Sequence, residues 1–275
     1  MASAREQATL AAPVAFSGVG LHTGAQASVE VRPAEAGTGL IFLLDGVRVP
    51  ATAEYVVDTS RATVIGRDGA SVSTTEHLLS ALFAMGVTNA EIAVSGPEIP
   101  VGDGSARGFV EQIAAAGVRR QGAAAEILAL GEPLVVRDGN KMVMALPADS
   151  FRVRFVADFP PPIGTEYFDA EIEPGLYARE VAAARTFGYL HEVEALRARG
   201  LALGGSLENA IVFAPEGPMQ PLRWPNEVVR HKVLDLIGDF ALLGAWPACE
   251  IVAIKSGHKL HAEVTRALRE LHQRV

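Results

Sequence analysis

The spacing of apolar residues divides the chain into strand-like and helix-like segments. Runs rich in β-branched residues and bounded by Gly and Pro predict strands at Ala27–Val31, Gly39–Leu43 and Ala90–Val94. Over Thr75–Met85 the period changes, and apolar side chains cover much of a helix surface, which predicts a buried helix that ends at Gly86. A second helix is predicted at Ala106–Ala116.

The second half of the chain repeats this order of strands followed by helices. Strands are predicted at Ile127–Val136, Lys141–Leu146 and Phe151–Ala157, and helices at Val181–Leu190, His191–Arg199, Glu227–Leu243 and Val264–Gln273. Gln121–Ala125, a stretch of small residues, could connect two domains. We therefore expect the α+β class, with an N-terminal domain over residues 1–122 and a C-terminal domain over residues 123–275.

One helix-strand pattern occurs twice. His77–Gly86 is followed by the strand-like Ala90–Gly96, and His231–Gly244 is followed by Cys249–Gly257. In both cases the order along the chain is helix, glycine, strand and Ser-Gly. A chance match in an α/β chain would look the same, so the pattern leaves duplication open. A true duplication predicts two similar domains that face each other.

Composition and charge narrow the choice of partners and compartment. The formal charge of −8 gives no general attraction to nucleic acid, which is therefore not an expected partner. A single cysteine, Cys249, excludes an intrachain disulfide and a multi-cysteine zinc site. Met1–Phe16 lacks the features of a signal peptide, and the apolar stretch Ile237–Ile254 is interrupted by acidic residues, Gly and Pro. We expect a cytoplasmic monomer without a membrane span, and contact with a lipid-bearing substrate at the membrane surface stays open.

The helix predicted at Glu227–Leu243 carries a polar stripe. His231, Asp235 and Asp239 follow one another at intervals of four residues and therefore share one face. An imidazole nitrogen and a carboxylate oxygen one turn apart can bind one zinc ion, but a catalytic site normally needs a third protein ligand. The alternative is a solvent-facing stripe on a surface helix. Spacing alone favours the surface helix without excluding a cleft.

A Glu-His pair opens the apolar helix. A helix so apolar should be buried, and a buried carboxylate without a partner is destabilising or shifts its pKa. A metal ion would satisfy both residues, because His77 could bind the ion while Glu76, about 100° around the helix, stands ready to activate its water. The alternative is that Thr74 or Thr75 caps the helix and Glu76 complements its dipole. This segment alone supports the two interpretations equally.

The histidines near the C-terminus differ in their expected roles. His258 follows a strand and Gly257, whose tight turn could present the imidazole for proton donation or oxyanion stabilisation. His261 and His272 lie in a helical segment with arginines, where we expect solvated surface positions for both.

Two glycine-containing segments are also candidates. Gly18–Gly24 lacks the lysine-threonine end of a phosphate loop, so we interpret it as a β-turn that lets His22 reach into a site. Asp103-Gly104-Ser105 is interpreted as a turn and helix cap.

Together these segments resemble the UDP-3-O-acyl-N-acetylglucosamine deacetylases, the zinc enzymes of lipid A biosynthesis. The resemblance runs almost end to end, and its markers occur in the family's order. They are Ser17-Gly-Val-Gly-Leu-His-Thr-Gly24, Thr75-Glu-His-Leu78, Pro97-Glu-Ile-Pro100 with Asp103-Gly-Ser105, Ala184-Arg-Thr-Phe-Gly188, Gly204-Gly-Ser206, Arg230-His-Lys-x-x-Asp235 and Lys255-Ser-Gly-His258. The resemblance implies two related α/β sandwich domains packed against each other with the active site between them.

The resemblance also implies the residues of the site. The implied zinc ligands are His77, His231 and Asp235, a set that is compatible with Fe²⁺ as well. The implied catalytic residues are the general base Glu76, the acid His258, the carboxylate Asp239 that orients His258, and the oxyanion-binding Thr186. The implied substrate-binding residues are Lys232, Lys255, Phe159, Phe187 and His22, with Phe159 stacking on uracil.

The implied reaction is hydrolysis of the N-acetyl group of a UDP-acyl-sugar, UDP-3-O-acyl-N-acetylglucosamine. The family's acyl channel corresponds to an insertion at about residues 188–209. Arg61 stands in a segment that is often apolar in the family, and Gly102 is smaller than usual, so the acyl length stays open. Two alternatives remain. One is a related zinc deacetylase for a different N-acetylated sugar conjugate, and the other is a zinc-binding protein without turnover.

Overall fold

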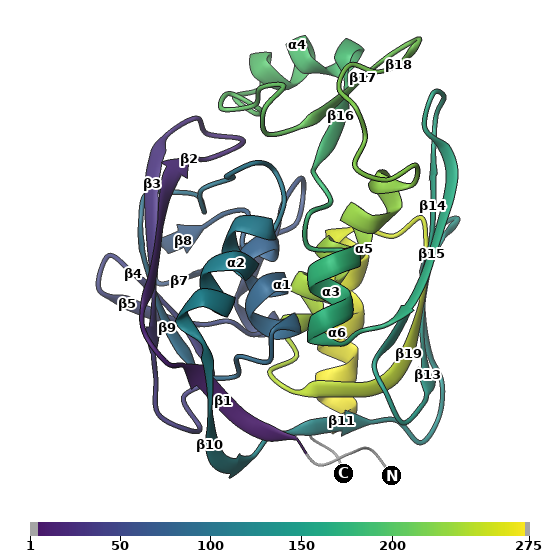
Figure 1. The fold of residues 1–275 in the computed structure, drawn as a ribbon. Coiled ribbons are helices and arrows are strands. Elements are labelled where there is room, and N and C mark those ends of the chain that lie inside the picture. The colour runs from purple at the N-terminus through teal and green to yellow at the C-terminus, as the bar shows by residue number, and fades with distance from the viewer. Residues whose placement is uncertain (1–4, 273–275) are drawn as a thin grey trace.

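Two sheets with the same strand order form the outer layers of the molecule. The computed structural model describes residues 5–272, and Figure 1 shows one sheet at each side with helices between them. The first sheet has the order β2-β3-β9-β4-β5 and the second β12-β13-β19-β14-β15, with β11 pairing to the start of β19. The strands of the first sheet are β2 Val14–Val19, β3 Gln26–Pro33, β4 Leu40–Leu44, β5 Val47–Pro50 and β9 Ala90–Ser95. Those of the second are β11 Ile127–Ala129, β12 Leu134–Asp138, β13 Lys141–Pro147, β14 Arg152–Phe159, β15 Gly164–Glu171 and β19 Trp246–Ile254.

The pairing directions repeat along with the strand order. The central strand of the first sheet, β9, is antiparallel to β3 and parallel to β4. The central strand of the second, β19, is likewise antiparallel to β13 and parallel to β14. Each central strand follows a largely buried helix, which is α1 (Glu76–Ala84) for β9 and α5 (Glu227–Ala241) for β19. The helix-strand pattern that occurs twice in the sequence therefore occurs twice in the structure, while the boundary between residues 122 and 123 stays a prediction.

The remaining helices fill the space between the sheets (Figure 1). They are α2 Arg107–Ala116, α3 Pro174–Glu180 and α6 His258–His272. Helix α1 packs against α2 and α5, and α5 packs against α6 and against β14 and β15. One hydrophobic core runs through both halves. Within it, Phe83 of α1 stacks on Trp246 of β19 with ring centroids 4.8 Å apart, and Phe151 contacts both rings edge-on.

A glycine brings α1 and α5 unusually close together. Every residue of α1 is buried, including Glu76 and His77 at its start. A Cβ atom added at Gly238 of α5 would overlap the backbone carbonyl of Glu76. Because only glycine lacks this atom, Gly238 permits the close approach of the two helix backbones. The polar stripe of α5 is thereby pressed against the first turn of α1.

A smaller layer covers one end of the helix layer, at the top of Figure 1. It consists of β16 Phe187–Tyr189, α4 Leu190–Ala198, β17 Ile211–Ala214 and β18 Gly217–Pro218. Tyr189, Ile211 and Phe213 pack with Val228 of α5 in a separate small cluster. Helix α4 has no buried residue, so the expected insertion at residues 188–209 projects from the body of the fold.

Short strands complete the structure. Strands β6 Val56–Asp58, β7 Val64–Arg67 and β8 Ala70–Val72 form a sheet next to the first half, and the single turn η1 Ala53–Tyr55 precedes it. Strand β1 Glu6–Leu10 pairs with β10 Val118–Ala124. In residues 5–272, no helix is long and apolar enough to cross a membrane.

Four predicted elements differ from the observed ones. The connector at Gln121–Ala125 is largely strand, because Val118–Ala124 pairs with β1. The strand predicted at Ile127–Val136 is divided into β11 and β12, since the intervening residues include Gly131 and Pro133, which interrupt a strand.

The helix predicted at Val181–Leu190 is also wrong. Pro174 starts α3 earlier, in the first-turn position that proline favours, and the helix ends at Glu180. The apolar residues that follow are buried in turns, and Phe187–Tyr189 forms β16 instead. The last helix begins at His258, six residues before the predicted start at Val264.

The close contact at Gly238 predicts a large effect of a single methyl group. Gly238→Ala should lower the free energy of unfolding by about 3 kcal/mol or more, because the methyl group must displace the backbone of α1. Gly108→Ala is the matched control: a Cβ at Gly108, also within a helix, meets no other atom within 4 Å, and the change should stabilise by about 0.5–1 kcal/mol. Urea unfolding measures both, and equal effects would contradict the packing described.

Candidate active site

Three potential metal ligands meet where α1 begins and α5 completes its first turns. The Nε2 atoms of His77 and His231 lie 3.6 and 3.4 Å from Oδ1 of Asp235. The two imidazole rings are nearly perpendicular, with centroids 5.1 Å apart. All three side chains are buried. The structure thus brings together the three residues that the sequence proposes as ligands.

The separations of these atoms fit a shared cation. They are too long for good hydrogen bonds, whereas two atoms bound at about 2.0–2.1 Å to one tetrahedral Zn²⁺ lie about 3.3 Å apart. The Nδ1 atom of His231 lies 3.1 Å from the carbonyl oxygen of Ala184, and a hydrogen bond donated there leaves Nε2 free to bind a metal. The geometry therefore suits a divalent metal ion.

The protonation states fit a cation as well. Burial lowers the pKa of His231 to about 4, so this imidazole is neutral at pH 7. Burial opposes ionisation of Asp235, but His231 and Lys232 outweigh it and hold the pKa of Asp235 well below its usual range. Lys232, predicted to bind substrate, lies with its Nζ atom 2.6 Å from Oδ2 of Asp235. Two imidazoles and one carboxylate form a donor set with a single negative charge.

Glu76 stands beside this cluster with one oxygen toward the site. Its Oε2 atom accepts a hydrogen bond of 3.0 Å from the backbone N–H of Thr63. Its Oε1 atom lies 3.7 Å from Nε2 of His258. Burial raises the pKa of Glu76, although the nearby His258 and His77 partly oppose this shift. A carboxylate with a raised pKa is suited to accept a proton near neutral pH.

His258 is the first residue of α6 and faces Glu76. Its Nδ1 atom lies 2.9 Å from Oδ2 of Asp239. Burial alone would lower the pKa of His258, but Asp239 and Glu76 together raise it to about 9. Asp239 is buried too, and its histidine partners bring its pKa to about 2. The pair is therefore a carboxylate and an imidazolium at pH 7.

Two neighbours of Asp239 escaped the sequence analysis. Thr63 donates its hydroxyl to Oδ1 of Asp239, and no motif marked this residue. His261 was expected at the surface, and that prediction is wrong: the side chain is fully buried, with Nδ1 2.7 Å from Oδ2 of Asp239. The signal that was missed is the start of α6 at His258. In a helix that begins there, His258 and His261 are one turn apart on the same face. His272 is half-buried and contacts Glu126 at the surface.

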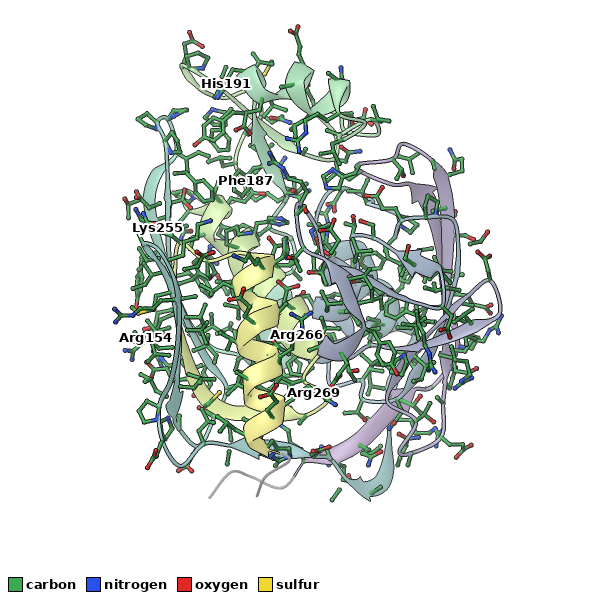
Figure 2. All side chains as sticks on the ribbon, turned by 180° about the vertical axis from the view of Figure 1, so that it is seen from behind. Arg154, Phe187, His191, Lys255, Arg266 and Arg269 are labelled. Carbon is green, nitrogen blue, oxygen red and sulfur yellow. The ribbon has the colours of Figure 1, made fainter. Side chains whose placement is uncertain are left out.

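Aromatic residues lie over the cluster from the second half. Phe187 contacts Phe159 edge-on, with centroids 5.0 Å apart, and its ring lies 6.2 Å from that of His231. Lys255, the residue after β19, forms an ion pair with Asp158 next to Phe159. Figure 2 shows Phe187 at the junction with the end layer and Lys255 beside the second sheet, where it follows the central strand β19.

Thr186 is fixed through its backbone at the base of the end layer. Its N–H donates to the carbonyl of Gly104, and its own carbonyl accepts from the N–H of Ile211. The turn predicted at Asp103–Ser105 is confirmed, since Asp103 accepts from the N–H and hydroxyl of Ser105. Thr186 is therefore held between this turn and β17.

Glu98 holds the glycine-rich loop that carries His22. This fully buried carboxylate accepts hydrogen bonds from the backbone N–H groups of His22 and Thr23 and from the hydroxyls of Thr23 and Thr74. A Cβ at Gly20 would overlap the Glu98 carboxylate, so the loop needs glycine there. Burial lowers the pKa of His22. Glu98 opposes this shift, and the nearby Arg61, His77 and His258 add to it.

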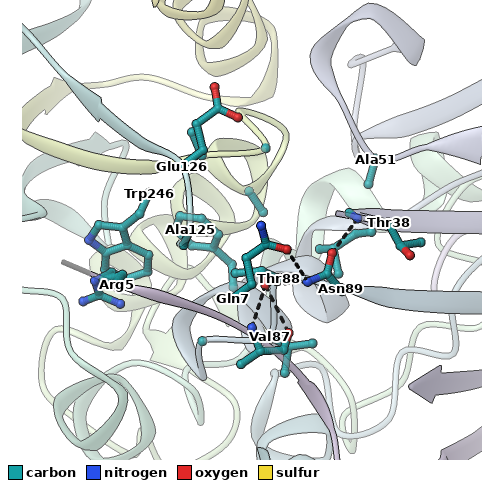
Figure 3. Close-up of a pocket in the computed structure, with 18 of the residues that line it drawn as sticks. Arg5, Gln7, Thr38, Ala51, Val87, Thr88, Asn89, Ala125, Glu126 and Trp246 are labelled. Carbon is teal, nitrogen blue, oxygen red and sulfur yellow. Dashed lines mark hydrogen bonds between the residues drawn. The ribbon is translucent and has the colours of Figure 1, made fainter. Parts of the chain in front are cut away.

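A cavity of about 720 Å³ lies away from these residues. Figure 3 shows its wall, where Arg5 lies on the ring of Trp246 and Asn89 donates a hydrogen bond to Gln7. It adjoins the C-terminal ends of α1 and α5, whereas His77 lies in the first turn of α1 and His231 lies near the start of α5. None of the three potential metal ligands lines this cavity. We therefore assign the chemistry to the cluster of His77, His231 and Asp235 and not to the cavity.

The site has the parts of a metal-assisted hydrolase. A buried carboxylate and a protonated imidazole flank three potential metal ligands, an arrangement suited to moving protons during addition of water to a carbonyl. The fold and the site together define a hydrolytic enzyme.

Comparison with known proteins identifies the family. The family model described as LpxC: UDP-3-O-acyl N-acetylglycosamine deacetylase matches residues 7–270. Similar proteins named UDP-3-O-acyl-N-acetylglucosamine deacetylase include one from Syntrophotalea carbinolica, 46% identical over 95% of this chain and 87% of the relative. Another is from Myxococcus xanthus, 45% identical over 96% and 86%. The chain belongs to the LpxC family of deacetylases.

The Glu98 hydrogen bonds predict a pH-dependent contribution to stability. Burial opposes ionisation of Glu98, but the donors from His22 and Thr23 outweigh it and lower its pKa. A lowered folded-state pKa stabilises the fold above the unfolded value of about 4.3, and this contribution is lost as pH falls through the folded pKa. Glu98→Gln should therefore lower the free energy of unfolding by about 2 kcal/mol at pH 7. Thermal unfolding from pH 7 to pH 3 should show the difference shrinking, and a difference independent of pH would refute the ionised state.

Proposed function

We propose that the protein hydrolyses the N-acetyl group of UDP-3-O-acyl-N-acetylglucosamine in lipid A biosynthesis, releasing acetate and UDP-3-O-acyl-glucosamine. The observation that carries this proposal is the position of His258. Its Nε2 atom lies 3.7 Å from Glu76 and 3.9 Å from Asp235, so a proton acceptor and a proton donor border the same three-donor cluster. The names of the relatives supply the substrate.

We further propose that zinc is the resident metal, held by His77, His231 and Asp235. When bound, zinc acts as a Lewis acid toward the carbonyl and lowers the pKa of water. Fe²⁺ suits the same donors. A closed structural zinc site usually has four protein ligands, and the cluster in residues 5–272 offers three. This favours catalysis over a zinc-binding protein without turnover.

The residues of the chain divide the proton transfers between them. Glu76 accepts a proton from the water whose oxygen adds to the acetamide carbon. Cationic His258 and the hydroxyl of Thr186 stabilise the negative charge that develops on the carbonyl oxygen. As the C–N bond breaks, the proton of His258 goes to the departing nitrogen, so acetate and a free amine result. Asp239 keeps His258 charged and directs its Nε2 atom into the site.

Side chains around the metal ligands are assigned to the individual groups of the substrate. We assign Phe159 and Phe187 to the uracil end, because aromatic rings stack on planar bases, and Lys232, Lys255 and His22 to polar parts of the substrate. The end layer at residues 188–209 is assigned to the acyl chain. A cytoplasmic monomer with domains at residues 1–122 and 123–275 remains our proposal, with contact at the membrane surface through the lipid-bearing substrate.

A second candidate substrate is a different N-acetylated sugar conjugate. Arg61 is exposed and lies close enough to His22 to lower its pKa. A cation at this position would favour a polar or anionic group where the family's substrate has an acyl chain. Comparing acyl-sugar and unacylated sugar nucleotides as substrates separates the two candidates.

Loss of either proton-transfer group should nearly abolish turnover. Glu76→Gln and His258→Gln should each lower kcat by about 10²–10⁴-fold, because each removes one general acid or base. Acetate release from UDP-3-O-acyl-N-acetylglucosamine by metal-loaded protein measures the effect. Arg266→Gln, which is remote from the cluster, serves as the control and should retain activity. Full turnover in both site variants would exclude the assigned roles.

The pKa shifts predict a bell-shaped dependence of kcat/KM on pH. Activity should rise as Glu76 ionises through its raised pKa and fall as His258 loses its proton at about 9. Asp239→Asn removes a charge that raises the pKa of His258, so the alkaline limb should move to lower pH. Identical alkaline limbs in the two proteins would contradict the role of Asp239.

A further inference from the structure

His261 is the most deeply buried titratable group near the site that the mechanism above does not use. Its side chain is fully buried, although it lies on the same helix as the surface residue His272. Nδ1 lies 2.7 Å from Oδ2 of Asp239, and Nε2 lies 2.8 Å from the hydroxyl of Ser256. Both ring nitrogens therefore have a partner.

These contacts are hydrogen bonds and not part of a second metal site. The Nδ1 atoms of His258 and His261 both approach Oδ2 of Asp239, at 2.9 and 2.7 Å. Atoms that share a tetrahedral metal ion lie about 3.3 Å apart, as the Asp235 cluster does within a few tenths. The shorter distances around Asp239 match N–H donors on an oxygen acceptor.

The partners also fix the protonation of His261. An ionised Asp239 only accepts, so Nδ1 of His261 carries a hydrogen and donates it. Burial lowers the pKa of His261, so the ring is neutral and Nε2 accepts from the hydroxyl of Ser256. The result is a directed chain in which Ser256 donates to His261 and His261 donates to Asp239.

Asp239 is thereby held from three directions. Thr63 donates to its Oδ1 atom, while His258 and His261 both donate to Oδ2. Without His261, Oδ2 would keep one protein donor and could turn away from Nδ1 of His258. Because Asp239 orients His258, such a rotation would misdirect the Nε2 atom that faces Glu76.

We propose that His261 is a positioning residue for the deacetylase reaction: with Ser256 behind it, it fixes the Asp239 carboxylate so that His258 presents Nε2 to the reacting nitrogen. This inference rests on the proposed function. His261 thereby joins the residues that control proton donation. It does not contact the substrate and acts only through Asp239.

Three substitutions of His261 distinguish an effect of its hydrogen bond to Asp239 from an effect of its packing. His261→Asn places an amide N–H near the position of Nδ1, His261→Gln places one near Nε2, and His261→Leu places none. We expect kcat for acetate release to fall about tenfold to a hundredfold in the Leu variant, with KM and bound metal unchanged. The Asn variant should recover most of the lost kcat, and the Gln variant should not.

A matched control and a coupled variant complete the test. Thr265→Val alters another fully buried side chain one turn along α6, whose hydroxyl has no partner among residues 5–272, and it should leave kcat unchanged. In an Asp239→Asn background, His261→Leu should cause little further loss, because the residue acts through Asp239. A Leu variant no worse than Thr265→Val, or a loss that is fully additive with Asp239→Asn, would overturn the proposal.

A spectroscopic measurement keeps the proposal testable if the Leu variant does not fold. In ¹⁵N-histidine-labelled wild-type protein, NMR should show His261 as the neutral tautomer with hydrogen on Nδ1. A neutral ring with hydrogen on Nε2 would exclude donation to Asp239 and overturn the proposal without reference to activity. Absence of acetate release by the wild-type protein would instead count against the proposed function.

Discussion

The contact between α1 and α5 at Gly238 is the constraint on which the site depends. The first turn of α1 supplies Glu76 and His77, and α5 supplies His231, Asp235 and Asp239. Neither helix alone carries enough ligands for a catalytic metal. The missing Cβ at Gly238 lets α5 lie directly on the backbone of Glu76. Only at that distance do the donors of two separate helices come within reach of one ion.

Burial of so many ionisable groups would be unfavourable without mutual pairing. Glu76, Asp235 and Asp239 are all buried, and removing the partner of a buried charge typically costs about 3–5 kcal/mol. Lys232 compensates Asp235, and His258 with Thr63 compensates Asp239. Glu76 has a backbone N–H on one oxygen, and residues 5–272 place no close donor on the other. The least compensated carboxylate is thus the one assigned to accept a proton.

The internal repeat explains why the site lies where it does. Each half presents a helix layer toward the other, and the two largely buried helices, α1 and α5, precede the equivalent central strands β9 and β19. The two helices meet along the face between the halves. The repeat builds the layers and places a histidine near the start of each helix, His77 and His231, while Asp235 and Asp239 occur on α5 alone.

Much of the fold and of the candidate site could be predicted from the sequence, because local periodicity indicates where helices and strands form and which residues share a face. The i, i+4 stripe on α5 and the Glu-His pair that opens α1 both report which residues share a helix face, and the resemblance to a known family joined them. The contacts of Thr63 and His261 with Asp239 depend on tertiary packing across 176 and 22 residues of sequence, which no local pattern records. The wrong prediction of a helix at Val181–Leu190 also results from tertiary packing. Its apolar residues are buried because neighbouring elements cover them, and not because they form one face of a helix.

The most direct test of the central claim is the metal content of purified protein and of single ligand variants by elemental analysis. One divalent ion per chain in the wild type is predicted, with loss of the ion in His77→Ala and Asp235→Ala and retention in Glu76→Gln. An ion that remains bound in both ligand variants would contradict a site built from α1 and α5.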